Sequence, residues 1–121
     1  MKITCGTDII EIERVKKSIE NYGDKFLKKI FTEEEIKYCE SHKDNKYQHY
    51  AARFASKEAV YKALSDIIPQ EELVWNKIEI INDKKTGKPK INITNEKIED
   101  IDISISHCKL YAISVVNALI K

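Results

Sequence analysis

The segment Arg53–Lys62 places a carboxylate within a helix-forming stretch whose neighbours are largely apolar. Six positions spaced by three or four residues would share one helical face, and they read Tyr47, Ala51, Phe54, Glu58, Tyr61 and Ser65. A carboxylate on a buried face is costly unless it meets a cation or a metal ion. Lys62 follows Glu58 by one turn, so a cation is within reach. An ordinary Glu–Lys pair in water is the alternative interpretation.

A second acidic residue lies in a predicted strand. Ile3–Ile10 alternates in strand fashion, and Asp8 sits there although Asp is depleted in strands. Two carboxylates from separate elements can bind one Mg²⁺, which completes its shell with waters and substrate phosphate. Several basic residues would suit a polyphosphate ligand, namely Arg53, Lys57 and Lys62 in the helix and Lys84, Lys85 and Lys88 in a turn. No Walker or dinucleotide glycine motif occurs.

His107 ends another alternating stretch and would titrate near neutral pH. A histidine that is merely hydrogen-bonded at a strand end is the alternative. Its neighbour Cys108 would point to the opposite face of a strand, which argues against a nucleophile pair. Cys39 and His42 have a ligand-like spacing, but no second pair completes a four-ligand zinc site.

The elements that must position these residues follow from periodicity and turn residues. We expect helices at 9–22, 25–31, 33–41 and about 47–65, with Thr32 and Glu35 as the capping box of the third. Strands are expected at 3–10, 77–82, 90–94, 101–106 and 111–119, the last being apolar on both faces and therefore central. A strand, then helices, then strands predicts one α+β domain over 1–121, with an antiparallel sheet packed against helices.

Composition excludes several classes of protein. With 34% charged and 42% hydrophobic residues among 121, the chain is typical of a soluble globular domain. A net charge of +1 and the lack of an aromatic RNA-binding motif argue against nucleic acid as a partner. No apolar run approaches the ~20 residues of a membrane span. Met1–Gly6 carries no signal-peptide pattern, and the three cysteines form no CxxC motif, so we expect a cytoplasmic location.

Three blocks carry a family resemblance, and they are Gly6–Arg14, Arg53–Lys62 and Ser104–Ala112. In this order and at these spacings they resemble holo-(acyl-carrier-protein) synthases, the short bacterial 4′-phosphopantetheinyl transferases. The resemblance implies that fold, and Mg²⁺-dependent transfer of 4′-phosphopantetheine from coenzyme A to a serine of apo-acyl carrier protein. It further implies release of 3′,5′-ADP and a role in fatty acid biosynthesis. Two departures are Thr4, where the family usually has glycine, and Ser56, where alanine is common.

The resemblance also implies roles for individual residues. Asp8 and Glu58 would hold Mg²⁺, and Lys62, with Arg53, would act on the phosphates. The nucleotide cleft would be lined by Gly87, Lys88, Pro89, Ser106 and His107. The catalytic residues would be Glu58, Lys62 and His107, and the general base stays open between Glu58, acting through a water, and His107.

The resemblance implies partners as well. Arg14 on the first helix would dock the acidic carrier protein, and Lys17, Lys25, Lys28 and Lys29 would extend this patch, although plain solvated lysines are the alternative for these four. A homotrimer with active sites between subunits is implied. Physically, an apolar strand such as 111–119 gains by association. Two other classes stay open from the residues alone: a non-catalytic α+β binding module, and a different Mg²⁺-dependent enzyme such as a nucleotide hydrolase.

Overall fold

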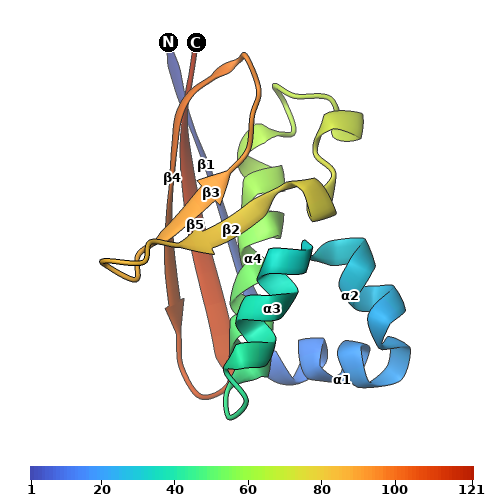
Figure 1. The fold of residues 1–121 in the computed structure, drawn as a ribbon. Helices are drawn as coiled ribbons and strands as arrows, with labels where there is room; N and C mark the ends of the chain where they lie inside the picture. The colour runs from blue at the N-terminus through green and yellow to red at the C-terminus, as the bar shows by residue number, and fades with distance from the viewer.

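The computed structural model describes residues 1–121, and it combines a three-stranded sheet, a two-stranded hairpin and four α-helices (Figure 1). In chain order the elements are β1 (Lys2–Glu11), α1 (Ile12–Tyr22), α2 (Asp24–Ile30), α3 (Glu33–Ser41), α4 (Lys46–Leu64), the 3-10 helices η1 (Gln70–Glu72) and η2 (Trp75–Lys77), β2 (Glu79–Asn82), β3 (Pro89–Asn92), β4 (Ile98–His107) and β5 (Tyr111–Ile120). The predicted α+β class with an antiparallel sheet is confirmed.

The sheet has the order β1-β5-β4, so β5 is the central strand, as expected. Alternation along the strands directs Ile103 toward the core, where it is 3% exposed, and leaves Asp102 and Ser104 on the outer face. That outer face is apolar over part of its area, since Ile3 is 74% and Ile9 61% exposed. We call it the outer sheet face.

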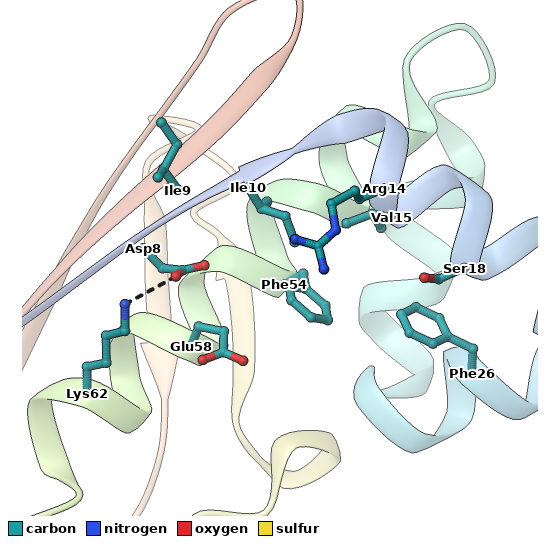
Figure 2. Close-up of a pocket in the computed structure, with 10 residues that line it drawn as sticks. All are labelled: Asp8, Ile9, Ile10, Arg14, Val15, Ser18, Phe26, Phe54, Glu58 and Lys62. Atoms are coloured by element: carbon teal, nitrogen blue, oxygen red, sulfur yellow. Dashed lines mark hydrogen bonds and ion pairs between the residues drawn. The ribbon is translucent and has the colours of Figure 1, made fainter.

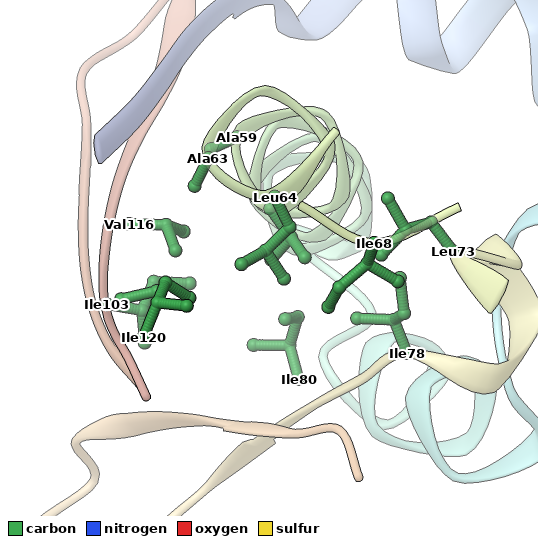
Figure 3. Packing of buried hydrophobic residues seen from close by; sticks show 12 residues of the cluster. Ala59, Ala63, Leu64, Ile68, Leu73, Ile78, Ile80, Ile103, Val116 and Ile120 are labelled. Carbon is green, nitrogen blue, oxygen red and sulfur yellow. The ribbon is translucent and has the colours of Figure 1, made fainter. Parts of the chain in front are cut away.

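Helix α4 lies across the inner face of the sheet and has a hydrophobic cluster toward each end. Toward its C-terminal end, Ala59, Ala63 and Leu64 pack between the sheet residue Val116 and Ile80 of the hairpin (Figure 3). Around its N-terminal half, a second cluster joins α4 to α1, α2 and α3. None of the helices combines the length and apolar character that crossing a membrane requires.

Four element boundaries differ by two or more residues from the sequence-based expectation, and one of them is the end of β3, which lies at Asn92 rather than at Thr94. Helix α1 begins at Ile12 rather than Ile9, because residues 9–11 continue β1 and pair with 111–113 of β5. Strand β2 begins at Glu79 because the preceding residues form η2. Strand β4 begins three residues earlier than expected, at Ile98, with an irregular register between Ile98 and Asp100. The capping box of Thr32 and Glu35 is confirmed.

The expectation that Glu58 lies on the buried face of α4 is wrong. Of the six residues on that row, only Ala51 is fully buried, whereas Phe54, Glu58 and Tyr61 are half-buried. The helix buries the neighbouring rows instead, because it is covered by the sheet on one side and by the hairpin and α3 on others. Glu58 therefore lies at the edge of a buried helix, where a side chain can face a cavity.

Candidate functional site

A cavity of about 370 Å³ lies between β1, α1, α2 and α4, and we call it the carboxylate cavity (Figure 2). Its polar side chains are Asp8, Arg14, Ser18, Glu58 and Lys62, and its apolar wall is formed by Ile9, Ile10, Val15, Phe26 and Phe54. The structure thus brings together both residues of the predicted metal pair and one residue predicted to act on phosphates. Figure 2 shows the Asp8 and Glu58 carboxyl groups turned toward the same space.

Gly6 explains how Asp8 reaches this position. A Cβ atom at residue 6 would lie 2.0 Å from the carbonyl oxygen of Ala59 and 2.7 Å from the backbone nitrogen of Ala63. Only glycine lets β1 pass so close to α4. Two residues later the strand alternation returns to the same face, so Asp8 is placed beside the turn of α4 that carries Glu58 and Lys62.

Four charged side chains line the carboxylate cavity: Asp8 and Glu58 are acidic, and Arg14 and Lys62 are basic. The Lys62 ammonium lies 3.3 Å from Asp8 Oδ1 and donates to the Thr7 carbonyl oxygen at 3.1 Å. Partial burial, followed by the negative charge of Asp8, raises the pKa of the Glu58 carboxyl group, and Lys62 opposes this. Glu58 has no ion pair of its own and faces the same space as Asp8, so the two carboxylates can meet one additional cation.

A second cavity, of about 680 Å³, lies beside the β2–β3 hairpin, and we call it the hairpin cavity. Its lining includes Glu34, Tyr38, Arg53, Ile80, Ile81, Asn82, Asp83, Lys84, Gly87 and Lys90. Arg53 and Gly87 were predicted to bind the nucleotide; Lys88 is exposed in the adjoining turn, and Pro89 begins β3. The two cavities share no lining residue, so the predicted ligand-binding residues fall into separate groups.

Arg53 is the buried cation of the hairpin cavity, with 3% of its surface exposed. Its Nη2 donates to Asn82 Oδ1 at 2.7 Å, and its guanidinium carbon lies 4.2 Å from the centroid of the Tyr38 ring. Its Nε atom is buried and has no hydrogen-bond partner. A buried N–H group without a partner is expensive, and the positive charge of Arg53 favours an anionic group in this cavity.

Ser106 and His107 lie at the exposed end of β4 and line neither cavity. The Gln48 side-chain nitrogen lies 2.9 Å from each ring nitrogen of His107. Nearby, the rings of His42 and His49 are 4.2 Å apart. Burial, followed by the positive charges of His42, Arg53 and His107, lowers the pKa of His49 to about 4.

The residues predicted to dock the carrier protein lie on the two N-terminal helices. Arg14 reaches the rim of the carboxylate cavity from α1, and Lys17 and Lys28 are exposed on α1 and α2. No ion pair occupies Arg14, Lys17 or Lys28. A partner carrying acidic groups therefore has free cations to meet beside the cavity.

Sequence reasoning assigned one basic residue wrongly and missed its partner. Lys57 was expected among the cations facing a polyphosphate, but it is fully buried and pairs with Glu35 at 2.7 Å. Glu35 was identified only as half of a capping box. The pairing of Glu35 with Lys57 had one indication in the sequence. Lys57 lies on the same helical row as Val60 and Leu64, which are core residues.

Comparison with known proteins identifies the family. Residues 4–116 match the model of the 4′-phosphopantetheinyl transferase superfamily. The chain is 46% identical over 122 residues to the holo-(acyl-carrier-protein) synthase of Ruminiclostridium cellulolyticum, covering 94% of this chain and 90% of that protein. It is 49% identical over 113 residues to the enzyme of the same name from Thermodesulfovibrio yellowstonii, covering 92% and 93%.

Solved structures agree with this. The holo-(acyl-carrier-protein) synthase of Bacillus anthracis in complex with coenzyme A (3′,5′-ADP) superimposes with a TM-score of 0.80 at 36% identity, covering 95% of this chain and 94% of that chain. The Helicobacter pylori enzyme in complex with coenzyme A gives 0.80 at 33% identity, covering 97% and 99%. The chain belongs to the 4′-phosphopantetheinyl transferase superfamily. The expectation of a transferase of the holo-(acyl-carrier-protein) synthase type is thereby confirmed.

Proposed function

We propose that this chain, acting as one domain, transfers 4′-phosphopantetheine from coenzyme A to a serine hydroxyl of an apo-acyl carrier protein. The observation that carries the proposal is the meeting of Asp8, Glu58 and Lys62 in one cavity of a chain 46% identical to a holo-(acyl-carrier-protein) synthase. In the reaction, the serine oxygen bonds to the β-phosphorus of coenzyme A and loses its proton to a base. The bond between that phosphorus and the bridging oxygen breaks, and 3′,5′-ADP leaves.

Asp8 and Glu58 are the residues that would hold Mg²⁺. The donor set fits, because Mg²⁺ in proteins typically takes one or two carboxylates and completes its shell with waters and substrate phosphate. The chain has no cluster of three or more His, Cys, Asp or Glu side chains that would favour a closed, all-protein site. When bound, Mg²⁺ supplies neutralisation of the charge that develops on the pyrophosphate.

Side chains of the protein would bind the charged phosphates and accept the proton of the serine hydroxyl. The Lys62 ammonium, which pairs with Asp8 in the structure, is close enough to turn toward a phosphate oxygen of a bound pyrophosphate. Glu58 is one candidate for accepting the serine proton through a water, and its raised pKa brings it nearer to the working pH. His107 is the other candidate, contributed from the end of β4.

Two separate cavities support an active site shared between copies of the chain. We propose a homotrimer in which the carboxylate cavity of one subunit and the hairpin cavity of a neighbour contact the same coenzyme A. Arg53, with its buried and unpaired Nε, is then placed to bind a phosphate of the nucleotide. The exposed apolar residues of the outer sheet face supply a surface for association.

The carrier protein would dock on α1 and α2. Arg14 at the rim of the carboxylate cavity, together with Lys17 and Lys28, can pair with acidic groups while the serine enters the cavity. We expect the protein to act in the cytoplasm, in support of fatty acid biosynthesis.

Intact mass spectrometry tests the proposal directly. The protein is incubated with coenzyme A, Mg²⁺ and an apo-acyl carrier protein, and the carrier is expected to gain one phosphopantetheine group while 3′,5′-ADP appears. An unmodified carrier, with release of inorganic phosphate instead, would assign the site to a nucleotide hydrolase.

A further inference from the structure

The most deeply buried charges of this chain lie outside both cavities. The Lys57 ammonium and the Glu35 carboxylate are 2.7 Å apart, and both side chains are 0% exposed. Neither residue lines the carboxylate cavity or the hairpin cavity. Burying two charges is costly, and a well-packed apolar pair is often as stable or more so. The pair therefore calls for an explanation other than stability.

The pair connects four elements: the two helices that carry it, and η2 and β2, to which it is hydrogen-bonded. The Lys57 ammonium donates to the Trp75 carbonyl oxygen at 2.6 Å and to the Ile78 carbonyl oxygen, so its three N–H groups all have acceptors. Glu35 Oε1 accepts from the Thr32 backbone N–H at 2.9 Å, and Oε2 accepts from the Ile80 N–H at 2.9 Å. Helix α4 is thereby fixed to the start of α3, to η2 and to β2.

These bonds control the direction of Glu58. Successive residues of an α-helix point about 100° apart, so holding Lys57 in one direction sets the rotation of α4 at Glu58. The Phe54 ring, which belongs to the wall of the carboxylate cavity, packs at 5.1 Å on Trp75, whose carbonyl oxygen Lys57 also holds.

The same pair is also hydrogen-bonded to a residue that lines the hairpin cavity. Ile80, whose backbone N–H is bound by Glu35, lies in the lining of the hairpin cavity with Asn82, the partner of Arg53. The β2–β3 hairpin is thus bonded to the same point that sets the rotation of α4.

We propose that Glu35 and Lys57 are positioning residues that align the carboxylate cavity and the hairpin cavity for ligand binding. The inference rests on the proposed function, because it takes the ligands of these cavities to be a divalent cation and coenzyme A. Partners that orient metal ligands change metal affinity by 10- to 100-fold in other proteins. Loss of the pair is therefore expected to weaken Mn²⁺ and coenzyme A binding by at least about 10-fold.

Two variants separate positioning from simple loss of stability. Lys57→Met leaves the buried Glu35 carboxylate without a charge partner, and it can fail to fold. The double variant Glu35→Gln/Lys57→Met carries no charge at either position, and it also lacks the ammonium bonds to the carbonyl oxygens of Trp75 and Ile78. Mn²⁺ binding is measured by electron paramagnetic resonance and coenzyme A binding by calorimetry, at a temperature where far-UV circular dichroism shows each protein folded.

Two controls accompany the variants. Ile120→Ala truncates a core residue that lines neither cavity and is expected to lower Tm without changing either Kd. Lys46→Ala breaks a partly exposed pair with Glu40, and neither residue lines either cavity, so this variant should change neither Kd. Trp75 is the only tryptophan, so the near-UV circular dichroism of the double variant is expected to change through the loss of its anchor.

The outcomes are distinct. A folded double variant that binds Mn²⁺ and coenzyme A within about two-fold of the unsubstituted protein overturns the positioning role and leaves the proposed function intact. If Ile120→Ala weakens binding as much as the double variant does, general destabilisation explains the effect and the positioning role is likewise overturned. An unsubstituted protein that binds neither ligand overturns the proposed function, and the positioning role with it.

Discussion

At the scale of single residues, the two carboxylates of the carboxylate cavity differ in their partners. Lys62 pairs with Asp8, while Glu58 has no ion pair of its own. A ligand that brings both a divalent cation and phosphate oxygens satisfies all three side chains together. A free phosphate without a cation would leave the two carboxylates unbalanced.

Replacing Asp8 tests the assignment of the metal pair. Asp8→Asn is expected to lower Mg²⁺-dependent turnover by at least about 100-fold and to weaken Mn²⁺ binding, because one of two carboxylate ligands is lost. Asp66→Asn is the matched control. Asp66 follows the C-terminal end of α4 in the chain, is exposed, and lines neither cavity. Near-normal turnover of Asp8→Asn would remove Asp8 from the site.

The general base is identified by the pH dependence of the rate. Loss of a base costs about 10²–10⁴-fold. If Glu58 accepts the proton, His107→Ala keeps the acidic limb of the profile, and that limb reflects the raised pKa of Glu58. If His107 is the base, His107→Ala loses the limb, whereas a variant with unchanged rate and unchanged profile excludes His107 altogether. The measurement is kcat against pH for His107→Ala and for Glu58→Gln.

His49 links stability to pH. Its pKa falls from 6.5 to about 4 on folding, so the unfolded chain binds more protons between these values. Stability is therefore full above about pH 6.5 and is lost as the pH falls toward 4, by up to about 2 kcal/mol after solvent screening. His49→Gln should flatten the dependence of Tm on pH over this interval, and an unchanged dependence would assign the acid lability to other groups.

At the scale of elements, the approach of β1 to α4 sets the position of Asp8. Gly6→Ala forces a methyl group against the backbone of Ala59 and Ala63, so one of the two elements must move. Overpacking of this kind costs about 1–3 kcal/mol, and Mn²⁺ affinity is expected to fall as Asp8 moves with its strand. Cys5→Ala, at the exposed neighbouring position, is the control and should keep both properties, as judged by thermal unfolding and Mn²⁺ titration.

The elements were more predictable from the sequence than the environments of their side chains. Alternation and capping located β1, α3 and β5 closely, because these depend on local periodicity. The start of α1 was misplaced because strand pairing with 111–113 overrides the helical pattern of 9–11. The pairing of Lys57 with Glu35 spans 22 positions between two helices, and no local pattern encodes such a contact.

The meeting of Asp8 and Glu58 in one cavity had a different kind of signal. Asp8 contradicts the preference of its strand, and such contradictions concentrate at functional sites, whereas Glu58 lies at the half-buried edge of its helix and was singled out for a burial that the structure does not show. Gly87 was assigned to ligand binding only through a family resemblance, whereas Arg53 was also expected among the basic residues that suit a polyphosphate. Their division from Asp8 and Glu58 into a separate cavity depends on the packing of the hairpin, which the sequence pattern does not specify.

At the scale of the whole molecule, mixing subunits tests whether one active site combines the two cavities from neighbouring chains. Asp8→Asn disables the carboxylate cavity, and Arg53→Gln disables the hairpin cavity. If each active site takes one cavity from each of two neighbours, random co-assembly of equal amounts restores about one quarter of full activity, because half of each kind of cavity is intact. The activity of the co-refolded mixture is compared with the activity of each variant alone. A mixture no more active than the mean of the two single variants would place each site within one chain.

The neighbouring positions of the chain ends have a practical consequence. Lys2 pairs with Ile120, and both termini lie together at one end of the sheet, remote from α1 (Figure 1). A few flexible residues would therefore be enough to connect Lys121 back to Met1. A circularly permuted gene, opened in the exposed turn at 84–88, would then yield a protein with the same sheet and an untethered hairpin.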